Sequence, residues 1–434
     1  MTKSSQLLRA MFDAAIDAAM PAKILPPYLP PRPKGRLIVI GAGKASAAMA
    51  KVVEAHYGGR LEGLVITRYD HAVPCQHIEI VEASHPVPDA AGEAAARRIL
   101  ELVSNLSPDD LVLSLISGGG SALAALPADG VSLADKIAVN KALLQSGAPI
   151  GEMNIVRKHL SAIKGGRLAA QAFPAAMVSL MISDVPGDDP SVIASGPTVA
   201  DPSSFADARR IIAHYGIDLP PNVAAHLQAA ADETPKPGDP RLAKTTNHIV
   251  ARPQQSLEAA AEIAKLHGLL PKILGDAIEG EARDVAREMA QSVIEVCRFD
   301  GPWPANFVLI SGGETTVTVK GNGRGGRNVE FLLALGLALE GLVAGCEITA
   351  LAGDTDGIDG AGPAAGAILK SDSLLRAFRR GLSAEATLAN NDAMHFFEAL
   401  DDVVMTGPTL TNVNDFRAVL IEAKAGVISI PIEV

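Results

Sequence analysis

Short apolar runs alternate with helical stretches over the first half of the chain. We predict buried strands at residues 37–40, 64–67, 77–82, 111–116 and 177–182. Strands separated by helices favour a mainly parallel sheet covered on both faces, because each crossover helix packs back onto the sheet. The first half is therefore predicted to be a Rossmann-like three-layer α/β sandwich. In such a fold the functional loops follow the carboxyl ends of the strands.

The pattern restarts after a stretch at 231–240, which contains three prolines and one glycine. Proline and glycine at this density are typical of a linker. Further predicted strands follow at 248–251, 272–274, 307–310, 315–320 and 347–351. We therefore expect two α/β domains, residues 1–238 and residues 239–434.

Charge and composition narrow the class of partner. The 434 residues carry 38 Lys and Arg against 49 Asp and Glu, a formal net charge of −11, and only 3% are aromatic. Such a surface repels nucleic acid and anionic lipid, and it offers few rings for base stacking. The three cysteines lie far apart, and no apolar run approaches the roughly 20 residues of a membrane span. We expect a cytoplasmic protein with no nucleic-acid or membrane partner.

A glycine turn follows the first predicted strand. Gly41 and Gly43 flank one alanine, and Lys44 comes next, before a predicted helix. Backbone amides at such a turn favour an anion, and a lysine adds a cation beside them. The turn also half-matches a dinucleotide-binding fingerprint, in which Asp70 could contact a ribose, although Ser46 stands at the third glycine position. A tight turn without a ligand is the remaining alternative.

Two further glycine-rich loops follow apolar strands, one in each half of the chain. The first consists of Ser117, Gly118, Gly119, Gly120 and Ser121. The second consists of Ser311, Gly312, Gly313 and Glu314. Glycines let backbone amides approach a ligand closely, so a phosphate cradle is one interpretation and a sharp capped turn is the other.

Basic residues gather at two places in this acidic chain. Arg157 and Lys164 are spaced to share a helix face until Gly165 and Gly166 end it, which indicates either an anion site or a solvated helix face. Arg327 lies at the end of a loop with four glycines and two arginines. A flexible loop that carries a guanidinium can close over developing negative charge.

Carboxylates follow two of the predicted strands. Asp184 and Asp189 come after the strand at 177–182, where α/β enzymes often hold Mg²⁺. Asp354 and Asp356 lie in a second acidic loop, which could serve Mg²⁺ or a substrate hydroxyl. Ordinary acidic turns are the alternative in both cases. His85 is a lone histidine of the kind that is usually structural.

Glycine loops, fixed cations and strand-end carboxylates are together the parts of a phosphoryl-transfer site. No GxSxG nucleophile elbow and no zinc-ligand spacing occurs in the sequence, so acyl transfer and zinc chemistry are disfavoured.

The ordered motifs resemble the bacterial and archaeal glycerate 2-kinases, in which an N-terminal domain precedes a C-terminal MOFRL domain. The motifs are GAGKAS at 41–46, SGGGSAL at 117–123, NIVRKHLSAIKGGRLA at 154–169, SDVPGDDPSVIASGPT at 183–198, SGGETTVTVKGNGRGGRN at 311–328, GDTDGIDG at 353–360 and TGPTLTNVND at 406–415. Many members carry an older name, hydroxypyruvate reductase. Two departures are visible: Val329 stands where the family usually has Gln, and Leu410 where it usually has Gly.

The resemblance implies transfer of the γ-phosphoryl group of ATP to the 2-hydroxyl of D-glycerate, with Mg²⁺, in a cleft between the domains. It implies that Lys44 and Arg327 are the catalytic cations. On this basis we expect nucleotide or phosphate contacts from Gly41, Gly43, residues 117–121, Gly312, Gly313 and Glu314. We expect substrate contacts from Arg157, Lys164, Asp354 and Asp356, and metal contacts from Asp184 and Asp189.

Two other functions stay open from the sequence. An NAD(P)H-dependent hydroxypyruvate reductase would use the first glycine turn for pyrophosphate and Asp70 for ribose. A non-catalytic sugar-phosphate-binding regulator would bind its ligand without turnover. The expected partner is a small molecule, glycerate, and a homodimer is allowed.

Overall fold

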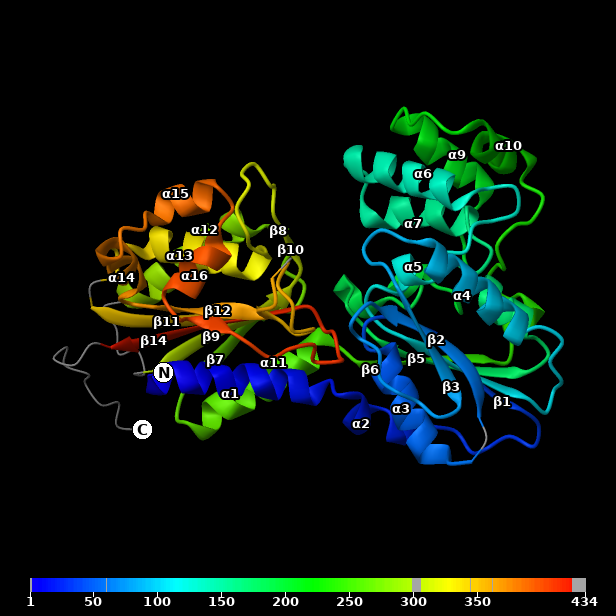
Figure 1. Ribbon diagram of the computed structural model, residues 1–434, viewed down its shortest axis with the longest axis horizontal. Coiled ribbons are helices and arrows are strands. Elements are labelled where there is room, and N and C mark those ends of the chain that lie inside the picture. Colours follow the sequence, from blue (N-terminus) through cyan, green and yellow to red (C-terminus); the bar gives the residue numbers. More distant parts are fainter. Residues whose placement is uncertain (1, 60, 299–305, 344, 361, 424–434) are drawn as a thin grey trace. The chain divides into compact units, whose positions relative to one another are not determined.

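The computed structural model describes residues 2–59, 61–298, 306–343, 345–360 and 362–423, which form two compact units (Figure 1). The N-terminal unit is Met20–Ala251. The C-terminal unit combines Arg252–Val434 with Met1–Ala19. Each unit is built on its own six-stranded sheet, which confirms the predicted α/β class.

The sheet of the N-terminal unit is entirely parallel, with strand order β3-β2-β1-β4-β5-β6. Its strands are β1 Leu37–Ala42, β2 Glu62–Arg68, β3 Ile78–Ala83, β4 Leu111–Ile116, β5 Ala176–Ile182 and β6 Thr245–Ala251. Ile38 and Ile40 of β1 pack in one core cluster with α4 and α8, and Val39 between them is equally buried. Both faces of the sheet are therefore covered, because neighbouring strand residues point to opposite faces.

Helices of the N-terminal unit follow its strands and add a separate small layer. They are α2 Pro21–Ile24, α3 Ser46–Tyr57, α4 Ala90–Leu102, α5 Gly120–Leu123, α6 Leu133–Gln145, α7 Ile150–His159, α8 Arg167–Ala172, α9 Phe205–His214 and α10 Pro221–Ala229. Short 3-10 helices lie at Pro26–Tyr28, Pro186–Asp188, Ile193–Ser195 and Pro240–Leu242. Helices α6, α7, α9 and α10 share a core of their own, which includes Val139, Val156 and Phe205.

The C-terminal unit has a mixed sheet with strand order β13-β12-β11-β14-β9-β7. Its strands are β7 Leu270–Gly275, β9 Phe307–Gly313, β11 Cys346–Asp354, β12 Gly366–Lys370, β13 Val403–Val404 and β14 Asp415–Ala423. Only the pair β7 and β9 is parallel among these. A separate two-stranded sheet joins β8 Gly280–Glu281 to β10 Thr315–Thr316, which is shorter than the strand predicted at 315–320.

Helices cover both faces of this second sheet (Figure 1). They are α1 Lys3–Ala18, α11 Pro253–Leu266, α12 Ala282–Arg298, α13 Arg327–Leu339, α14 Ser373–Arg379, α15 Ala384–Ala389 and α16 Ala393–Ala399. Helix α1 packs beside α11, and the ring of Phe12 lies 5.6 Å from that of Phe416. The hydroxyl of Thr411 donates to the carbonyl of Ala19 at 2.8 Å. These contacts explain why the first helix belongs to the C-terminal unit.

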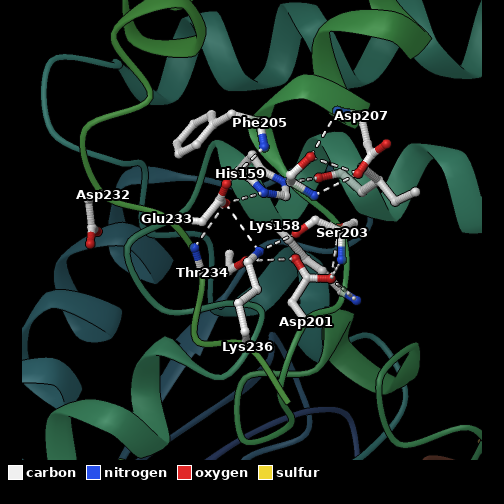
Figure 2. Close-up of polar contacts among 12 residues, drawn as sticks. Lys158, His159, Asp201, Ser203, Phe205, Asp207, Asp232, Glu233, Thr234 and Lys236 are labelled. Atoms are coloured by element: carbon white, nitrogen blue, oxygen red, sulfur yellow. Dashed lines mark hydrogen bonds and ion pairs between the residues drawn. The ribbon is translucent and has the colours of Figure 1, made fainter. Parts of the chain in front are cut away.

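The boundary between the units differs from the expected one at 238/239. Strand β6 pairs with β5, so the N-terminal unit continues to Ala251. The proline-rich stretch is bound to this unit rather than free as a linker (Figure 2). A hydrogen bond of 2.9 Å joins the Glu233 carboxylate to the ring of His159, and the Thr234 hydroxyl donates to Asp201 at 3.1 Å. The proline and glycine content of this stretch does not make it a linker, because its side chains contact residues that are distant in the sequence.

No helix in the described ranges is long and apolar enough to cross a membrane.

Candidate functional site

The glycine turn after β1 is shaped by the close approach of a neighbouring loop. Gly43 has φ +148°, and a Cβ there would lie 2.1 Å from the Ser117 hydroxyl oxygen. A Cβ on Gly41 would lie 2.4 Å from the carbonyl oxygen of Leu115 in β4. Such distances are sterically impossible, so both glycines are required for β1 and β4 to pack together.

The amides of this turn already donate within the protein. The Gly43 amide donates to the Ile66 carbonyl at 3.1 Å, and the Lys44 amide donates to the Gly118 carbonyl at 2.9 Å. The Ala45 amide donates to the Ser117 hydroxyl at 3.0 Å. The expected phosphate contact from Gly41 and Gly43 therefore gains no support from these donors, and we infer a structural role for both glycines. Ser117 acts in the same way, because its hydroxyl fixes the turn.

The loop after β4 differs from the turn after β1, because two of its backbone amides are available to a ligand. In the described part of the chain, no acceptor contacts the amides of Gly118 and Gly119. Gly119 has φ +80°, and a Cβ there would lie 2.9 Å from the ring of His85. A Cβ on Gly120 would lie 2.7 Å from the carbonyl oxygen of Ala42. This loop can thus present two amides to an anion.

A pocket of about 370 Å³ opens beside this loop. It brings together Gly119, Ser121, Arg157 and Lys164, which the sequence suggested at separate places. His85 and Lys136 also line it. The remaining walls are mainly apolar and include Pro86, Val87, Pro88, Val139, Leu143, Leu144, Val156 and Leu160. The pocket therefore has a cationic part and an apolar part.

Four basic side chains line the pocket, and three of them, Lys136, Arg157 and Lys164, are buried or half-buried without a carboxylate partner among the described residues. Lys136 donates to the Leu160 carbonyl at 3.2 Å, Arg157 to the Asn140 side chain at 2.7 Å, and Lys164 to the Ser121 carbonyl at 2.8 Å. Over the ranges that the structure describes, none of these three side chains forms an ion pair. Buried like charges of this kind repel one another and favour an anionic ligand.

The electrostatics of the pocket follow from burial and from this crowding of charge. Burial, and then the charge of Arg157, lowers the pKa of Lys136 to about 7. Burial, together with the charges of Lys136 and Arg157, lowers the pKa of Lys164 well below its usual range. Lys136 was not singled out from the sequence. Its only signal there is its spacing of three and seven residues from the apolar Val139 and Leu143, which would place all three on one face of a helix.

The predicted metal ligands Asp184 and Asp189 follow β5. Asp189 is exposed, and its carboxylate accepts from the Ser191 amide at 2.8 Å, whereas Asp184 is half-buried. Among the residues described, no group of three His, Cys, Asp or Glu side chains is arranged to hold a metal ion. Mg²⁺ bound with substrate phosphates needs only one or two carboxylates, so these aspartates fit that kind of site.

Arg327 is the centre of a second cluster, in the C-terminal unit. Its Nε donates to both carboxylate oxygens of Asp415, at 2.8 and 2.9 Å. One terminal nitrogen donates to Asp354 at 2.8 Å, and the other to Glu314 at 3.1 Å. Asp354 ends β11 and faces Asp415 at the start of β14, which in turn faces Gly313 at the end of β9. Three adjacent strand ends thus hold one guanidinium.

The carboxylates of this cluster stabilise the positive charge of Arg327. Burial lowers the pKa of Arg327, but the carboxylates of Asp415, Asp354 and Glu314 more than offset burial and raise it. Asp356 belongs to the same loop, where its amide donates to Asp354 at 3.0 Å. Gly313 has φ +118°, and a Cβ there would lie 2.3 Å from the Ile278 backbone. The predicted residues of this unit therefore do lie together.

Four further members of this cluster, Arg417, Asn328, Asp359 and Asp415, were not singled out from the sequence. The fully buried Arg417 donates to Asp415 at 2.8 Å and to the Gly312 carbonyl at 3.3 Å. Asn328 donates to Asp415 at 2.7 Å. The carboxylate of Asp359 accepts the first amides of α13, and burial raises its pKa to about 6. Asp415 itself lies within a quoted motif but was given no role.

Both departures from the family pattern have structural accounts. The Val329 side chain is fully buried in the main core of its unit, while its amide donates to Asp359 at 2.9 Å. That hydrogen bond is independent of the side chain. Leu410 has φ +64°, a conformation that glycine adopts without strain, so the usual glycine is understandable.

Comparison with known proteins agrees with these motifs. Residues 7–228 match a family model described as a domain of unknown function (DUF4147), and residues 307–415 match the MOFRL family. The chain is 40% identical over 403 residues to a D-glycerate 2-kinase of Thermotoga maritima, covering 92% of this chain and 94% of the relative. A protein of Agrobacterium vitis, provisionally named a hydroxypyruvate reductase, is 55% identical over 419 residues, covering 96% and 94%.

A solved structure gives the same result for the fold. The crystal structure of glycerate kinase from Thermotoga maritima superposes with a TM-score of 0.85 at 39% sequence identity, covering 96% of this chain and 99% of that one. The identity and coverage are high enough to transfer family membership as well as fold. The chain therefore belongs to the glycerate 2-kinase family, with an N-terminal DUF4147 domain and a C-terminal MOFRL domain.

Proposed function

We propose that this protein is an ATP- and Mg²⁺-dependent kinase that converts D-glycerate to 2-phosphoglycerate. The observation that carries the proposal is the pocket lined by Lys136, Lys141, Arg157 and Lys164, which offers four basic side chains and no carboxylate to an anionic ligand. A relative that is 40% identical over most of both chains is named a D-glycerate 2-kinase. Glycerate is a small monocarboxylate, so the basic side chains of the pocket can bind its carboxylate.

In the proposed complex the glycerate carboxylate lies against Arg157 and Lys164. Arg157 is already oriented by its hydrogen bond to Asn140. A planar guanidinium can take two carboxylate oxygens at once, which fixes the direction of the substrate. Lys136 adds positive charge to the site when it is protonated. The 2-hydroxyl is attached to the carbon next to the carboxylate, so anchoring the carboxylate favours reaction at that hydroxyl.

The remaining groups serve the phosphates. The amides of Gly118 and Gly119 and the hydroxyl of Ser121 would contact phosphate oxygens, since such donors suit an anion. Asp184 and Asp189 would hold Mg²⁺, which when bound neutralises charge on the ATP phosphates.

Lys44 and Arg327 would stabilise the charge that develops on the transferred group. Asp354 and Asp356 would orient the hydroxyl, with Glu314 and the backbone at Gly312 and Gly313 close to the nucleotide. Lys44 belongs to the N-terminal unit and Arg327 to the C-terminal unit.

A nicotinamide-dependent reductase is the alternative, and the name of the Agrobacterium vitis relative favours it. The turn after β1 argues against it, since the amides of Gly43, Lys44 and Ala45 already donate within the protein. Ser46, at the third glycine position, is buried and donates to the Leu115 carbonyl at 2.9 Å. A dinucleotide pyrophosphate would need backbone amides of this turn as hydrogen-bond donors, and these amides already donate to other groups of the protein.

One pair of assays separates the two activities. ADP release is measured with D-glycerate, ATP and Mg²⁺, and NADH oxidation is measured with hydroxypyruvate. Glycerate-dependent ADP release that stops when Mg²⁺ is chelated, without NADH oxidation, is the expected result. The product is then identified by adding enolase alone, which consumes only 2-phosphoglycerate. NADH oxidation without ADP release would refute the proposal, and a product that enolase does not consume would refute the position of transfer.

A further inference from the structure

Lys164, Ser121 and Ser195 form a hydrogen-bonded group at the wall of the pocket. The Lys164 Nζ contacts the Ser121 hydroxyl and lies 3.4 Å from the Ser195 hydroxyl. The two hydroxyl oxygens are 2.9 Å apart, and Ser195 donates onward to the Asn154 side chain at 3.1 Å. A serine in contact with a buried lysine is a known arrangement for an activated nucleophile.

The surroundings of Lys164 favour its neutral amine form. The residue is only 2% exposed, and among the described residues no carboxylate pairs with it. The charged groups that line the same pocket are Lys136 and Lys141 from α6 and Arg157 from α7, together with the ring of His85. None of these groups is negatively charged. Burial and positive neighbours both disfavour a third ammonium, so Lys164 can accept a proton.

Ser195 is held in a strained backbone conformation. Ala194 has φ +50° and Ser195 has φ +63°, values that residues other than glycine rarely adopt. Strain of this kind persists only where the surrounding contacts impose it, and it is concentrated at functional sites. Here it places the Ser195 hydroxyl against both Ser121 and Lys164.

The pocket also contains the two other parts that acyl transfer requires. The amides of Gly118 and Gly119, on the loop that carries Ser121, meet no acceptor in the described ranges and can stabilise an oxyanion. Apolar walls that include Val139, Leu143 and Leu144 can receive an acyl chain. Glycerate has no apolar group that would occupy this part of a pocket of about 370 Å³.

We propose a second activity in this pocket: ATP-independent hydrolysis of O-acyl esters of small hydroxy carboxylic acids, with Ser121 as nucleophile and Lys164 as general base. The acyl chain lies against the apolar walls, and the carboxylate of the hydroxy acid lies against Arg157 and Lys136. Ser195 positions the Ser121 hydroxyl. The activity needs no nucleotide, so it does not depend on the kinase reaction.

The first step transfers the acyl group to Ser121. The neutral Lys164 amine takes the hydroxyl proton while the Ser121 oxygen bonds to the ester carbonyl carbon. The carbonyl electron pair moves to its oxygen, which the Gly118 and Gly119 amides hold. The adduct then collapses, the bond to the hydroxy-acid oxygen breaks, and the Lys164 ammonium returns the proton to that oxygen. The products are the free hydroxy acid and acyl-Ser121.

The second step releases the acyl group to water. Water gives one proton to Lys164 while its oxygen bonds to the acyl carbon, and the same amides hold the oxyanion. The bond to Ser121 breaks, and Lys164 returns the proton to the serine oxygen. The carboxylic acid leaves, and the enzyme is restored with water as the only co-substrate and without any oxidant.

The test uses the full chain without ATP. Release of D-glycerate from O-butyryl-D-glycerate is followed by chromatography, and labelling by a fluorophosphonate is located by peptide mass spectrometry. Wild type is compared with Ser121→Ala, Lys164→Met and Ser195→Ala. Ser107→Ala is the matched control, because Ser107 is exposed and lies outside the pocket. Thermal unfolding of each variant is measured in parallel.

We expect one fluorophosphonate label per chain, on Ser121. Ester hydrolysis should fall at least about 100-fold in Ser121→Ala and in Lys164→Met, by analogy with other serine nucleophiles. Ser195→Ala should retain partial activity, because Lys164 still contacts Ser121, and Ser107→Ala should match wild type. Absence of hydrolysis and of label in wild type overturns the proposal. So does hydrolysis that survives Ser121→Ala, or a label on another residue.

Discussion

Asp415 holds Arg327 through both of its carboxylate oxygens, although the two residues are 88 positions apart in the chain. Asp415 begins β14 and Arg327 begins α13. The same carboxylate also accepts from the fully buried Arg417 and from Asn328. The direction of the Arg327 guanidinium is therefore fixed before any ligand binds. A group fixed in this way loses little entropy when it stabilises a transition state.

Replacing Arg327 should remove transition-state stabilisation. We expect Arg327→Ala to lower kcat for glycerate phosphorylation by at least about 100-fold, the scale of a lost charged donor. Arg324→Ala is the matched control, since this exposed arginine of the same loop pairs with Glu398 instead. It should change kcat less than about twofold. Steady-state kinetics with both proteins decide the matter, and near-normal kcat in Arg327→Ala would remove the residue from the mechanism.

Lys44 is the corresponding cation of the N-terminal unit. Lys44→Ala should also lower kcat by at least about 100-fold while the protein stays folded, because its ammonium would face the transferred phosphoryl group. Lys51→Ala serves as its control, since Lys51 lies on α3 with an exposed side chain that pairs with Glu54 at 3.8 Å. A Lys44→Ala enzyme with wild-type kcat would contradict this assignment even if Arg327 proves essential.

Asp415 should matter for stability as well as for activity. Asp415→Asn removes the carboxylate charge that pairs with the buried Arg417 at 2.8 Å, and uncompensated buried charges are costly. We expect the free energy of unfolding to fall by about 3–5 kcal/mol. Asp284→Asn, which breaks an exposed pair with Arg287, should change it by less than about 1 kcal/mol. Urea denaturation measures both, and equal losses in the two variants would rule out this explanation.

The lowered pKa of Lys136 predicts a pH dependence of substrate binding. The free enzyme binds a proton at Lys136 only below about pH 7, and a carboxylate prefers the protonated pocket. KM for D-glycerate should therefore be lowest below pH 7 and rise above it, by at most about tenfold per pH unit.

Lys136→Met should raise KM at pH 6 and lose this rise above pH 7, whereas Lys265→Met, at an exposed position on α11, should keep the wild-type profile. A rise in KM with pH that persists in Lys136→Met would assign the titration to another group.

The same lowered pKa also makes stability depend on pH. Between pH 10.5 and about 7 the unfolded chain binds a proton at Lys136, whereas the folded protein does not. Lys136 therefore lowers the free energy of unfolding as the pH falls through this range.

The glycine at position 43 should be irreplaceable on steric grounds. Gly43→Ala would put a Cβ 2.1 Å from the Ser117 hydroxyl oxygen and impose an alanine at φ +148°. We expect a loss of more than about 2 kcal/mol in the free energy of unfolding. Gly151→Ala is the control, because that helical position has open space and an ordinary φ, and it should gain about 0.5–1 kcal/mol. An unchanged denaturation midpoint for Gly43→Ala would show that the turn is not as tight as described.

The sequence by itself determined the α/β class, most strand positions and the segments that carry the chemistry. Apolar periodicity predicted β1, β4 and β5 because buried parallel strands are continuous apolar runs. The glycine loops and Arg327 were visible as motifs because their composition is unusual at short range. The boundary at 238/239 was misplaced, since proline and glycine content does not show that Glu233 and Thr234 bind His159 and Asp201.

Only the tertiary structure decided which residues meet. Lys136 joined Arg157 and Lys164 in one pocket, and Arg327 met Asp415, because strand order and helix packing set distances that sequence spacing does not encode. The same is true of Ser121, Lys164 and Ser195, which no local motif connects. Burial then changed their chemistry, because an ammonium loses stability when it leaves water among other positive charges.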